Sequence, residues 1–131
     1  ALPCHAVSLL FWMQGENKRK TGTFYEEMAA RYLESKGYKI LDRNYHCRAA
    51  ELDLIALDGE CLCFVEVKYR KNAAYEAPRG VVTNAKMNKN RLGARFYCME
   101  HGISEWHPMR FDVVMIIGEK LIHYENAFEG R

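Results

Sequence analysis

The chain has 131 residues, of which 49% are hydrophobic and 27% are charged. This length suits one compact domain better than two, and the composition is typical of a globular protein, which argues against a disordered chain. The net charge of +2 does not by itself distinguish a nucleic-acid-binding protein from other classes.

Residues 1–20 are interpreted as an N-terminal extension of unknown status, and residues 21–131 are expected to form a single domain. A first helix is predicted over residues 24–36, where hydrophobic residues recur at helical spacing. Thr23 and Glu26 have the spacing of a capping box, which is typical of a helix N-terminus.

A second helix and five strands are predicted in the remainder of the chain. The strands are expected over residues 38–45, 51–57, 61–70, 109–117 and 120–124. The second helix is expected over residues 84–100, with Thr83 as its capping residue. The predicted order is αβββαββ, which indicates an α/β fold with a mixed five-stranded sheet flanked by helices.

The hairpin formed by the second and third strands carries charged residues at one end. Alternation places Asp53 on one face of its strand, and Glu66 and Lys68 on one face of the next. A four-residue loop over residues 58–61 would set Asp53 opposite Glu66 and Glu51 opposite Lys68. The rest of the hairpin is apolar on both faces, which is typical of central strands covered on both sides. Four ionisable groups are therefore expected at one end of a largely buried hairpin.

Asp53 and Glu66 are expected to bind a divalent cation. Two facing carboxylates repel each other, and burial adds a further cost unless a group takes up a proton. Mg²⁺, or Mn²⁺ in its place, removes this cost and prefers carboxylates together with water and phosphate oxygens. Lys68 can then hold an attacking water and offset charge that develops on a phosphate. The alternative is that Glu66 and Glu51 form plain salt bridges with Lys68 on an exposed strand face.

Positive charge is concentrated between Lys68 and Arg95, where eight Lys or Arg residues accompany one acid, Glu76. This segment carries +7 and the rest of the chain −5, which indicates a basic face beside an acidic one. Four of its residues are candidates for contacts with nucleic-acid phosphates: Arg70, Lys86, Lys89 and Arg91. The alternative is a solvated helix face.

The five cysteines do not indicate a disulfide framework or a zinc knuckle, because their number is odd and no CxxC pair occurs. A reducing, cytoplasmic compartment is therefore expected. No apolar stretch approaches the length of a membrane span, so no membrane partner is expected.

The segments ELDLIA at residues 51–56 and FVEVKYR at residues 64–70 resemble the YraN family of uncharacterised bacterial proteins. That family is similar in fold to Holliday-junction resolvases and other PD-(D/E)xK nucleases. The resemblance extends over about residues 22–128 and includes Lys86 and the segment RFDVV at residues 110–114.

The resemblance implies a restriction-endonuclease-like fold and a set of catalytic residues. These are a nuclease triad with one additional acid at the metal: Asp53, Glu66, Lys68 and Glu26. From its position alone, Glu26 is equally well explained as the capping-box residue of its own helix. The chain departs from the family at Tyr25, where the family usually has glycine, and at Ala49-Ala50, where it usually has Phe-Gly.

The leading hypothesis is a metal-dependent DNA endonuclease that acts on branched or otherwise structured DNA, with a homodimer expected by analogy to resolvases. A second hypothesis is a nucleic-acid-binding module that keeps the nuclease fold with weak or lost catalysis, which the departures at Ala49 and Ala50 favour. A third hypothesis is a structural or interaction protein whose carboxylates form salt bridges. Only the first requires a bound divalent cation and cleavage that depends on Lys68.

Overall fold

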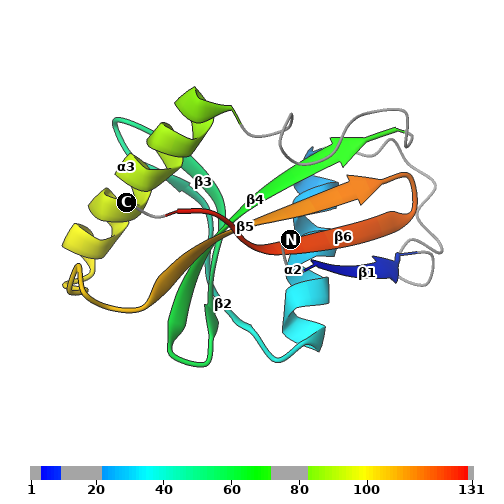
Figure 1. Ribbon diagram of the computed structural model, residues 1–131, viewed down its shortest axis with the longest axis horizontal. Coiled ribbons are helices and arrows are strands. Elements are labelled where there is room, and N and C mark those ends of the chain that lie inside the picture. The colour runs from blue at the N-terminus through cyan, green and yellow to red at the C-terminus, as the bar shows by residue number, and fades with distance from the viewer. Residues whose placement is uncertain (1–3, 10–21, 72–82, 130–131) are drawn as a thin grey trace.

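The computed structural model describes residues 4–9, 22–71 and 83–129. Within these residues the chain forms one sheet of six strands in the order β1-β6-β5-β4-β3-β2, with one helix packed on each face (Figure 1). The strands β4 and β5 are parallel, and all other neighbouring strands are antiparallel. The helix α3 lies between β4 and β5 in the chain, as the crossover between parallel strands requires.

The helices and strands have the following bounds. The helices are α2 (Gly22–Ser35) and α3 (Asn84–Glu100). The strands are β1 (Cys4–Ser8), β2 (Lys39–His46), β3 (Glu51–Asp58), β4 (Cys61–Arg70), β5 (Met109–Ile117) and β6 (Lys120–Phe128). The mixed α/β architecture and the predicted bounds of α3, β4 and β5 are confirmed. Neither of these two helices is long and apolar enough to cross a membrane.

The sheet differs from the predicted five-stranded sheet by one additional strand at its edge. This strand, β1, comes from the segment that was interpreted as an extension, and it pairs with β6. Because the two strands come from opposite ends of the chain, no local sequence signal marks their pairing. The helix α2 also begins earlier than predicted, at Gly22, so that Thr23 lies inside the helix instead of capping it.

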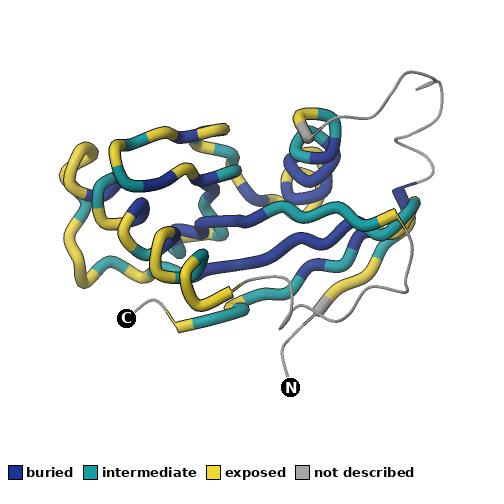
Figure 2. Tube along the Cα trace, turned by 90° about the horizontal axis from the view of Figure 1, so that it is seen from above, coloured by how far each residue is buried: buried dark blue, intermediate teal, exposed yellow. Residues whose placement is uncertain are grey.

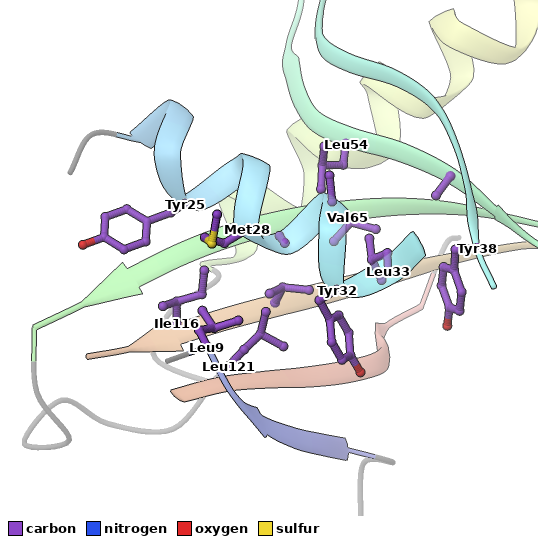
Figure 3. Close-up of a cluster of buried hydrophobic side chains, with 14 of the residues drawn as sticks. Leu9, Tyr25, Met28, Tyr32, Leu33, Tyr38, Leu54, Val65, Ile116 and Leu121 are labelled. Carbon is purple, nitrogen blue, oxygen red and sulfur yellow. The ribbon is translucent and has the colours of Figure 1, made fainter. Parts of the chain in front are cut away.

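A hydrophobic core fills the space between α2 and the sheet (Figure 3). Met28, Tyr32 and Leu33 of α2 are buried there against Leu54 of β3 and Val65 of β4. Helical spacing places the three α2 side chains on one face of the helix, and alternation directs the two strand residues toward it. The strand β4 therefore has one buried face that holds α2 in place.

The opposite face of the sheet packs against α3. Tyr97 of α3 lies in a second core with Ile55 of β3 and Phe64 of β4. Gly93 of α3 allows a close approach, since a Cβ atom at this position would lie 3.2 Å from both Ala50 Cβ and Leu52 Cγ. The central strands are thus covered on both faces, and Figure 2 shows the buried residues concentrated along them. The predicted central hairpin is confirmed, including the pairing of Ile55 with Phe64.

Candidate active site

The strands β3 and β4 diverge at the end of the hairpin where the charged residues lie. Their paired register runs from Asp58 and Cys61 at the turn to Leu54 and Val65. At the next position, a carboxylate oxygen of Asp53 accepts a hydrogen bond of 2.9 Å from the backbone N–H of Val67. The Asp53 side chain thus accepts the Val67 N–H, which would otherwise donate to a backbone carbonyl of the neighbouring strand.

Glu66 is a buried carboxylate that is paired with two lysines. Its side chain is only 4% exposed, and its Oε2 atom lies 3.4 Å from Lys68 Nζ and 3.7 Å from Lys86 Nζ. Lys68 follows two residues later on β4, whereas Lys86 reaches the same oxygen from the first turn of α3. The fold thus brings together the predicted Glu66, Lys68 and Lys86.

Glu26 connects α2 to the same place. Its carboxyl group lies near those of Asp53 and Glu66, whose negative charges raise its pKa, and near the side chain of Asn44 of β2, which lowers it. Asn44 has a left-handed backbone at φ 51°. Since Thr23 lies inside α2, the capping-box role considered for Glu26 does not fit. Three acids from three different elements are therefore neighbours at this site, although only the resemblance had suggested Glu26.

The environment disfavours ionisation of all three acids. Burial is the largest cause that raises the pKa of Asp53, Glu66 and Glu26 above the usual values. For Glu66 and Glu26 the next cause is the negative charge of Asp53. The positive charges of Lys86 and Lys68 lower the pKa of Asp53 and Glu66, but they do not fully offset burial. An additional positive charge at Asp53 and Glu66 would stabilise their ionised forms.

The donor set at this site suits a cation that keeps part of its water shell. No three His, Cys, Asp or Glu residues within the described parts of the chain form a ready-made metal site. Asp53 and Glu66 nevertheless supply two carboxylates, and Mg²⁺ commonly binds to proteins through one or two carboxylates with water and phosphate oxygens completing its shell. The residues present therefore fit Mg²⁺ or Mn²⁺ as a partly hydrated ion.

The remaining charged candidates differ in their exposure and in their contacts. Lys89 is exposed on α3, while Arg70 is half-buried and donates a hydrogen bond of 2.8 Å to the carbonyl oxygen of Tyr69. Arg91 donates a hydrogen bond of 2.7 Å to the carbonyl oxygen of Glu129 and lies over the Phe128 ring. Lys89 is thus presented to solvent, whereas Arg91 fastens α3 to the end of β6.

Glu51, which was expected opposite Lys68, has a different partner. Its Oε1 atom lies 3.3 Å from His46 Nδ1, and both side chains are exposed. The neighbouring residues of β2 and β3 are paired at this position, since His46 lies opposite Glu51 in the register. The expected salt bridge between Glu51 and Lys68 is therefore replaced by a contact within the hairpin of β2 and β3.

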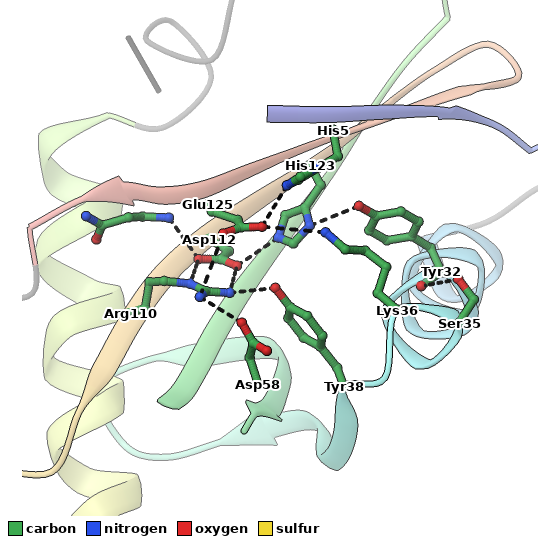
Figure 4. Close-up of polar contacts among 11 residues, drawn as sticks. His5, Tyr32, Ser35, Lys36, Tyr38, Asp58, Arg110, Asp112, His123 and Glu125 are labelled. Carbon is green, nitrogen blue, oxygen red and sulfur yellow. Dashed lines mark hydrogen bonds and ion pairs between the residues drawn. The ribbon is translucent and has the colours of Figure 1, made fainter. Parts of the chain in front are cut away.

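A buried polar network that the sequence did not reveal lies on the α2 side of the sheet (Figure 4). Asp112 and His123 are both fully buried, and Asp112 Oδ2 lies 2.8 Å from His123 Nε2. Arg110 binds both oxygens of Asp112, at 2.9 and 3.0 Å, and also reaches Asp58 and the Tyr38 hydroxyl. Burial alone would raise the pKa of Asp112, but hydrogen bonds from His123, Arg110 and the Asn126 backbone lower it below the usual value.

One signal for this network was present in the sequence. An aspartate in β5, which is apolar apart from Arg110 and Asp112, must find a partner when it is buried. Its partner His123 could not be named, because the pairing depends on the register between β5 and β6. The network joins four elements and lies apart from the acids around Asp53.

Both departures from the family pattern are accommodated by packing. The ring of Tyr25 is buried and stacks on Tyr69 with ring centroids 3.9 Å apart. Ala50 is buried beneath α3 at the point where Gly93 leaves room for it. Neither residue replaces a charged group of the site.

Comparisons with known proteins agree on one family. The chain matches the model of the uncharacterised protein family UPF0102 over residues 25–116. It is 40% identical to a UPF0102 protein of Lachnoclostridium phytofermentans, over 87% of this chain and 97% of that relative. It is also 44% identical to a UPF0102 protein of Marinobacter nauticus, over 79% of this chain and 84% of that relative. The matched region contains five of the charged residues described above: Glu26, Asp53, Glu66, Lys68 and Lys86. Because the family model and both relatives match most of its length, the chain belongs to the uncharacterised protein family UPF0102, the YraN family.

Proposed function

We propose that this protein is a metal-dependent endonuclease that hydrolyses phosphodiester bonds in DNA. The observation that carries the proposal is the buried Glu66, which shares its surroundings with Asp53 and with the ammonium groups of Lys68 and Lys86. Burying neighbouring carboxylates is unfavourable, and such arrangements with raised pKa values are concentrated at functional sites. Carboxylates beside lysines are also the groups that phosphodiester hydrolysis needs.

Each residue of the site has a distinct role in this proposal. Asp53 and Glu66 would hold Mg²⁺ or Mn²⁺, and Glu26, which lies near both carboxylates, would be the additional acid at the metal. The cation, when bound, supplies positive charge that stabilises the negative charge developing on the phosphate. Lys68 has three N–H donors, with which it can hold the attacking water and bind a phosphate oxygen.

The proposed substrate is DNA that is recognised by shape. Exposed Lys89 and half-buried Lys86 and Arg70 are suited to phosphate contacts, which position a nucleic acid without reading its bases. We therefore favour branched or otherwise structured DNA, in line with the resemblance to resolvases. By the same analogy we propose that the protein works as a homodimer. We propose a cytoplasmic location because the odd number of cysteines without a CxxC pair does not indicate a disulfide framework.

One observation favours the alternative of a nucleic-acid-binding module with weak or lost catalysis. Asp53 already accepts the Val67 N–H, and Glu66 is already paired with Lys68 and Lys86. Both acids thus have partners in the absence of a cation. In this alternative the lysines still bind phosphates, while the carboxylates serve to hold them in place.

A cleavage and binding experiment separates these functions. Purified protein is incubated with linear, nicked and four-way-junction DNA, with and without Mg²⁺ or Mn²⁺. The proposal expects cleavage that requires the cation and disappears in Lys68→Ala, which still binds DNA. Salt-sensitive binding without cleavage by the unmodified protein would support the binding module. Neither binding nor cleavage would indicate a structural protein.

A further inference from the structure

Lys86 occupies an unusual position for a lysine. It lies in the first turn of α3, where its backbone N–H donates to the Oγ1 atom of the capping residue Thr83 at 3.1 Å. The N-terminal end of a helix carries partial positive charge, so a lysine is unfavourable there and an acid is favoured. The first turn of α3 contains no acidic residue. A nearby anion is therefore needed to compensate, and Glu66 supplies it at 3.7 Å.

The two lysines at Glu66 together carry the charge that a divalent cation would bring. Both approach the same oxygen, Oε2, of a carboxylate that is almost completely buried. A cation with two positive charges at Glu66 would be repelled by both ammonium groups. Lys68 is tied to β4, two residues from Glu66, whereas Lys86 comes from a different element; the two side chains are similarly exposed, at 29% and 34%. Lys86 is therefore the lysine that can move away into solvent with less rearrangement of the sheet.

We propose that Lys86 is an exchangeable counter-ion, which pairs with Glu66 in the metal-free protein and is released to a DNA phosphate when a divalent cation binds. This inference rests on the proposed function, because it requires a cation at Asp53 and Glu66. It couples the binding of the cation to the binding of DNA. The cation and Lys86 compete for Glu66, and DNA binds more tightly once Lys86 is free. Such a link is reciprocal, so DNA also strengthens binding of the cation.

The first test measures Mn²⁺ binding by titration calorimetry in the absence of DNA. Lys86→Met removes the competing charge but keeps most of the side-chain volume. It should raise the Mn²⁺ affinity by up to about fivefold, the range expected for a partly exposed ion pair. Lys39→Met is the matched control, because Lys39 lies opposite Leu57 at the other end of β3. The control should leave the Mn²⁺ affinity unchanged, and Asp53→Asn should weaken it.

The second test measures binding of a linear DNA duplex, with Ca²⁺ as a hard, oxygen-binding cation that is intended not to support cleavage. Without a cation, Lys86→Met should lose less DNA affinity than it loses with Ca²⁺, because Lys86 is then paired with Glu66. With Ca²⁺, it should bind more weakly, and the slope of log affinity against log salt should become shallower by about 0.9, the contribution of one phosphate contact. A lysine with a purely structural role would not produce an effect that depends on the cation.

The outcomes distinguish the inference from the proposed function. If the unmodified protein binds Mn²⁺ through Asp53 but Lys86→Met has unchanged or weaker Mn²⁺ affinity, the exchange is overturned and the nuclease proposal stands. An equal loss of DNA affinity with and without Ca²⁺ overturns the exchange in the same way. If the unmodified protein does not bind Mn²⁺, or Asp53→Asn binds it equally well, both are overturned. Thermal melts of each variant check that the fold is retained.

Discussion

At the scale of single residues, the acids Glu26, Asp53 and Glu66 make the stability of the protein depend on pH. Their pKa values are raised in the folded protein from the usual 3.8 for Asp and 4.5 for Glu. The folded state therefore binds protons more readily than the unfolded state above these values. By linkage, the free energy of unfolding falls as the pH rises from about 4 through the raised pKa values. These buried acids thus lower the free energy of unfolding of the metal-free protein at neutral pH.

Asp53→Asn should make the metal-free protein as stable as the unmodified protein or more stable, by up to about 1 kcal/mol at neutral pH. The amide oxygen of the new side chain can still accept the Val67 N–H, while one negative charge is removed. Urea denaturation at several pH values should also show a weaker fall of stability with rising pH. Addition of Mg²⁺ should stabilise the unmodified protein and leave the variant unaffected.

Asp42→Asn on β2 is the control for this substitution, since Asp42 is not among the acids around Glu66. A loss of several kcal/mol in metal-free Asp53→Asn would indicate that Asp53 is a structural partner of the lysines.

Some residues of the candidate site could be predicted from the sequence pattern, and others could not. Alternation along two apolar strands placed Asp53, Glu66 and Lys68 at one end of the hairpin. The predicted pairs of Asp53 with Glu66 and of Glu51 with Lys68 lie beyond Leu54 and Val65, where the two strands no longer pair. Glu26 came only from the family resemblance, since α2 and the hairpin are brought together by tertiary packing. The hydrogen bond between His123 and Asp112 was missed for the same reason.

At the scale of elements, the packing of α3 on β3 depends on Gly93. Alanine is favoured over glycine in a helix by about 1 kcal/mol. At this position, however, its Cβ would lie 3.2 Å from Ala50 Cβ and Leu52 Cγ. Overpacking of a core typically costs about 1–3 kcal/mol. Gly93→Ala should therefore reduce the free energy of unfolding by about 1 kcal/mol, as measured by urea denaturation.

Ala50→Gly provides the matched test of this contact. Combined with Gly93→Ala, it should recover part of the lost stability, because one of the two close contacts is removed. Strictly additive effects of the two substitutions would show that the contact between Ala50 and α3 does not limit the packing.

The elements themselves were largely predictable, and their arrangement was not. Local signals such as the cap at Thr83 and the apolar run of β4 and β5 determined where these elements begin and end. By contrast, the short strand β1 becomes recognisable only through its pairing with β6. The order of strands in the sheet likewise depends on contacts between distant segments, which no periodicity reports.

At the scale of the whole molecule, the network around Asp112 holds together β5, β6, α2 and the end of β3. Asp112→Asn should reduce the free energy of unfolding by about 3–5 kcal/mol, because it leaves Arg110 without its buried partner. Because the pKa of Asp112 is lowered in the folded protein, this stabilisation is present above about pH 4 and is lost as the pH falls through the pKa of the folded state. Urea denaturation measures the loss, and a change below about 1 kcal/mol would contradict this role.

At the same scale, Lys86 and Lys89 of α3 should contribute to the DNA affinity of the protein. Lys86→Ala together with Lys89→Ala should weaken binding about equally for all sequences, since phosphate contacts carry no base information. The salt slope should become shallower by about one to two units, at about 0.9 per contact. Lys68→Ala should instead abolish cleavage and leave the affinity nearly unchanged.

Removal of Lys36 and Lys39 controls for the change in net charge. Both are exposed, and Lys39 lies opposite Leu57, at the end of β3 away from Asp53. If the Lys86 and Lys89 variant keeps its affinity and salt slope, DNA must follow a path elsewhere. The cluster Lys18-Arg19-Lys20, which lies outside the described residues, and Arg48 are then the next candidates.

The hydrogen bond from Val67 to Asp53 gives the protein a natural spectroscopic reporter. An amide proton that is bound to a carboxylate shifts its resonance when that carboxylate gains a proton or turns toward a cation. The Val67 peptide group lies directly between Glu66 and Lys68 in the chain, so its signal can follow events at the site without any added label. A titration of one backbone resonance, observed in the intact protein, would then register protonation and metal binding at Asp53 separately from the rest of the molecule.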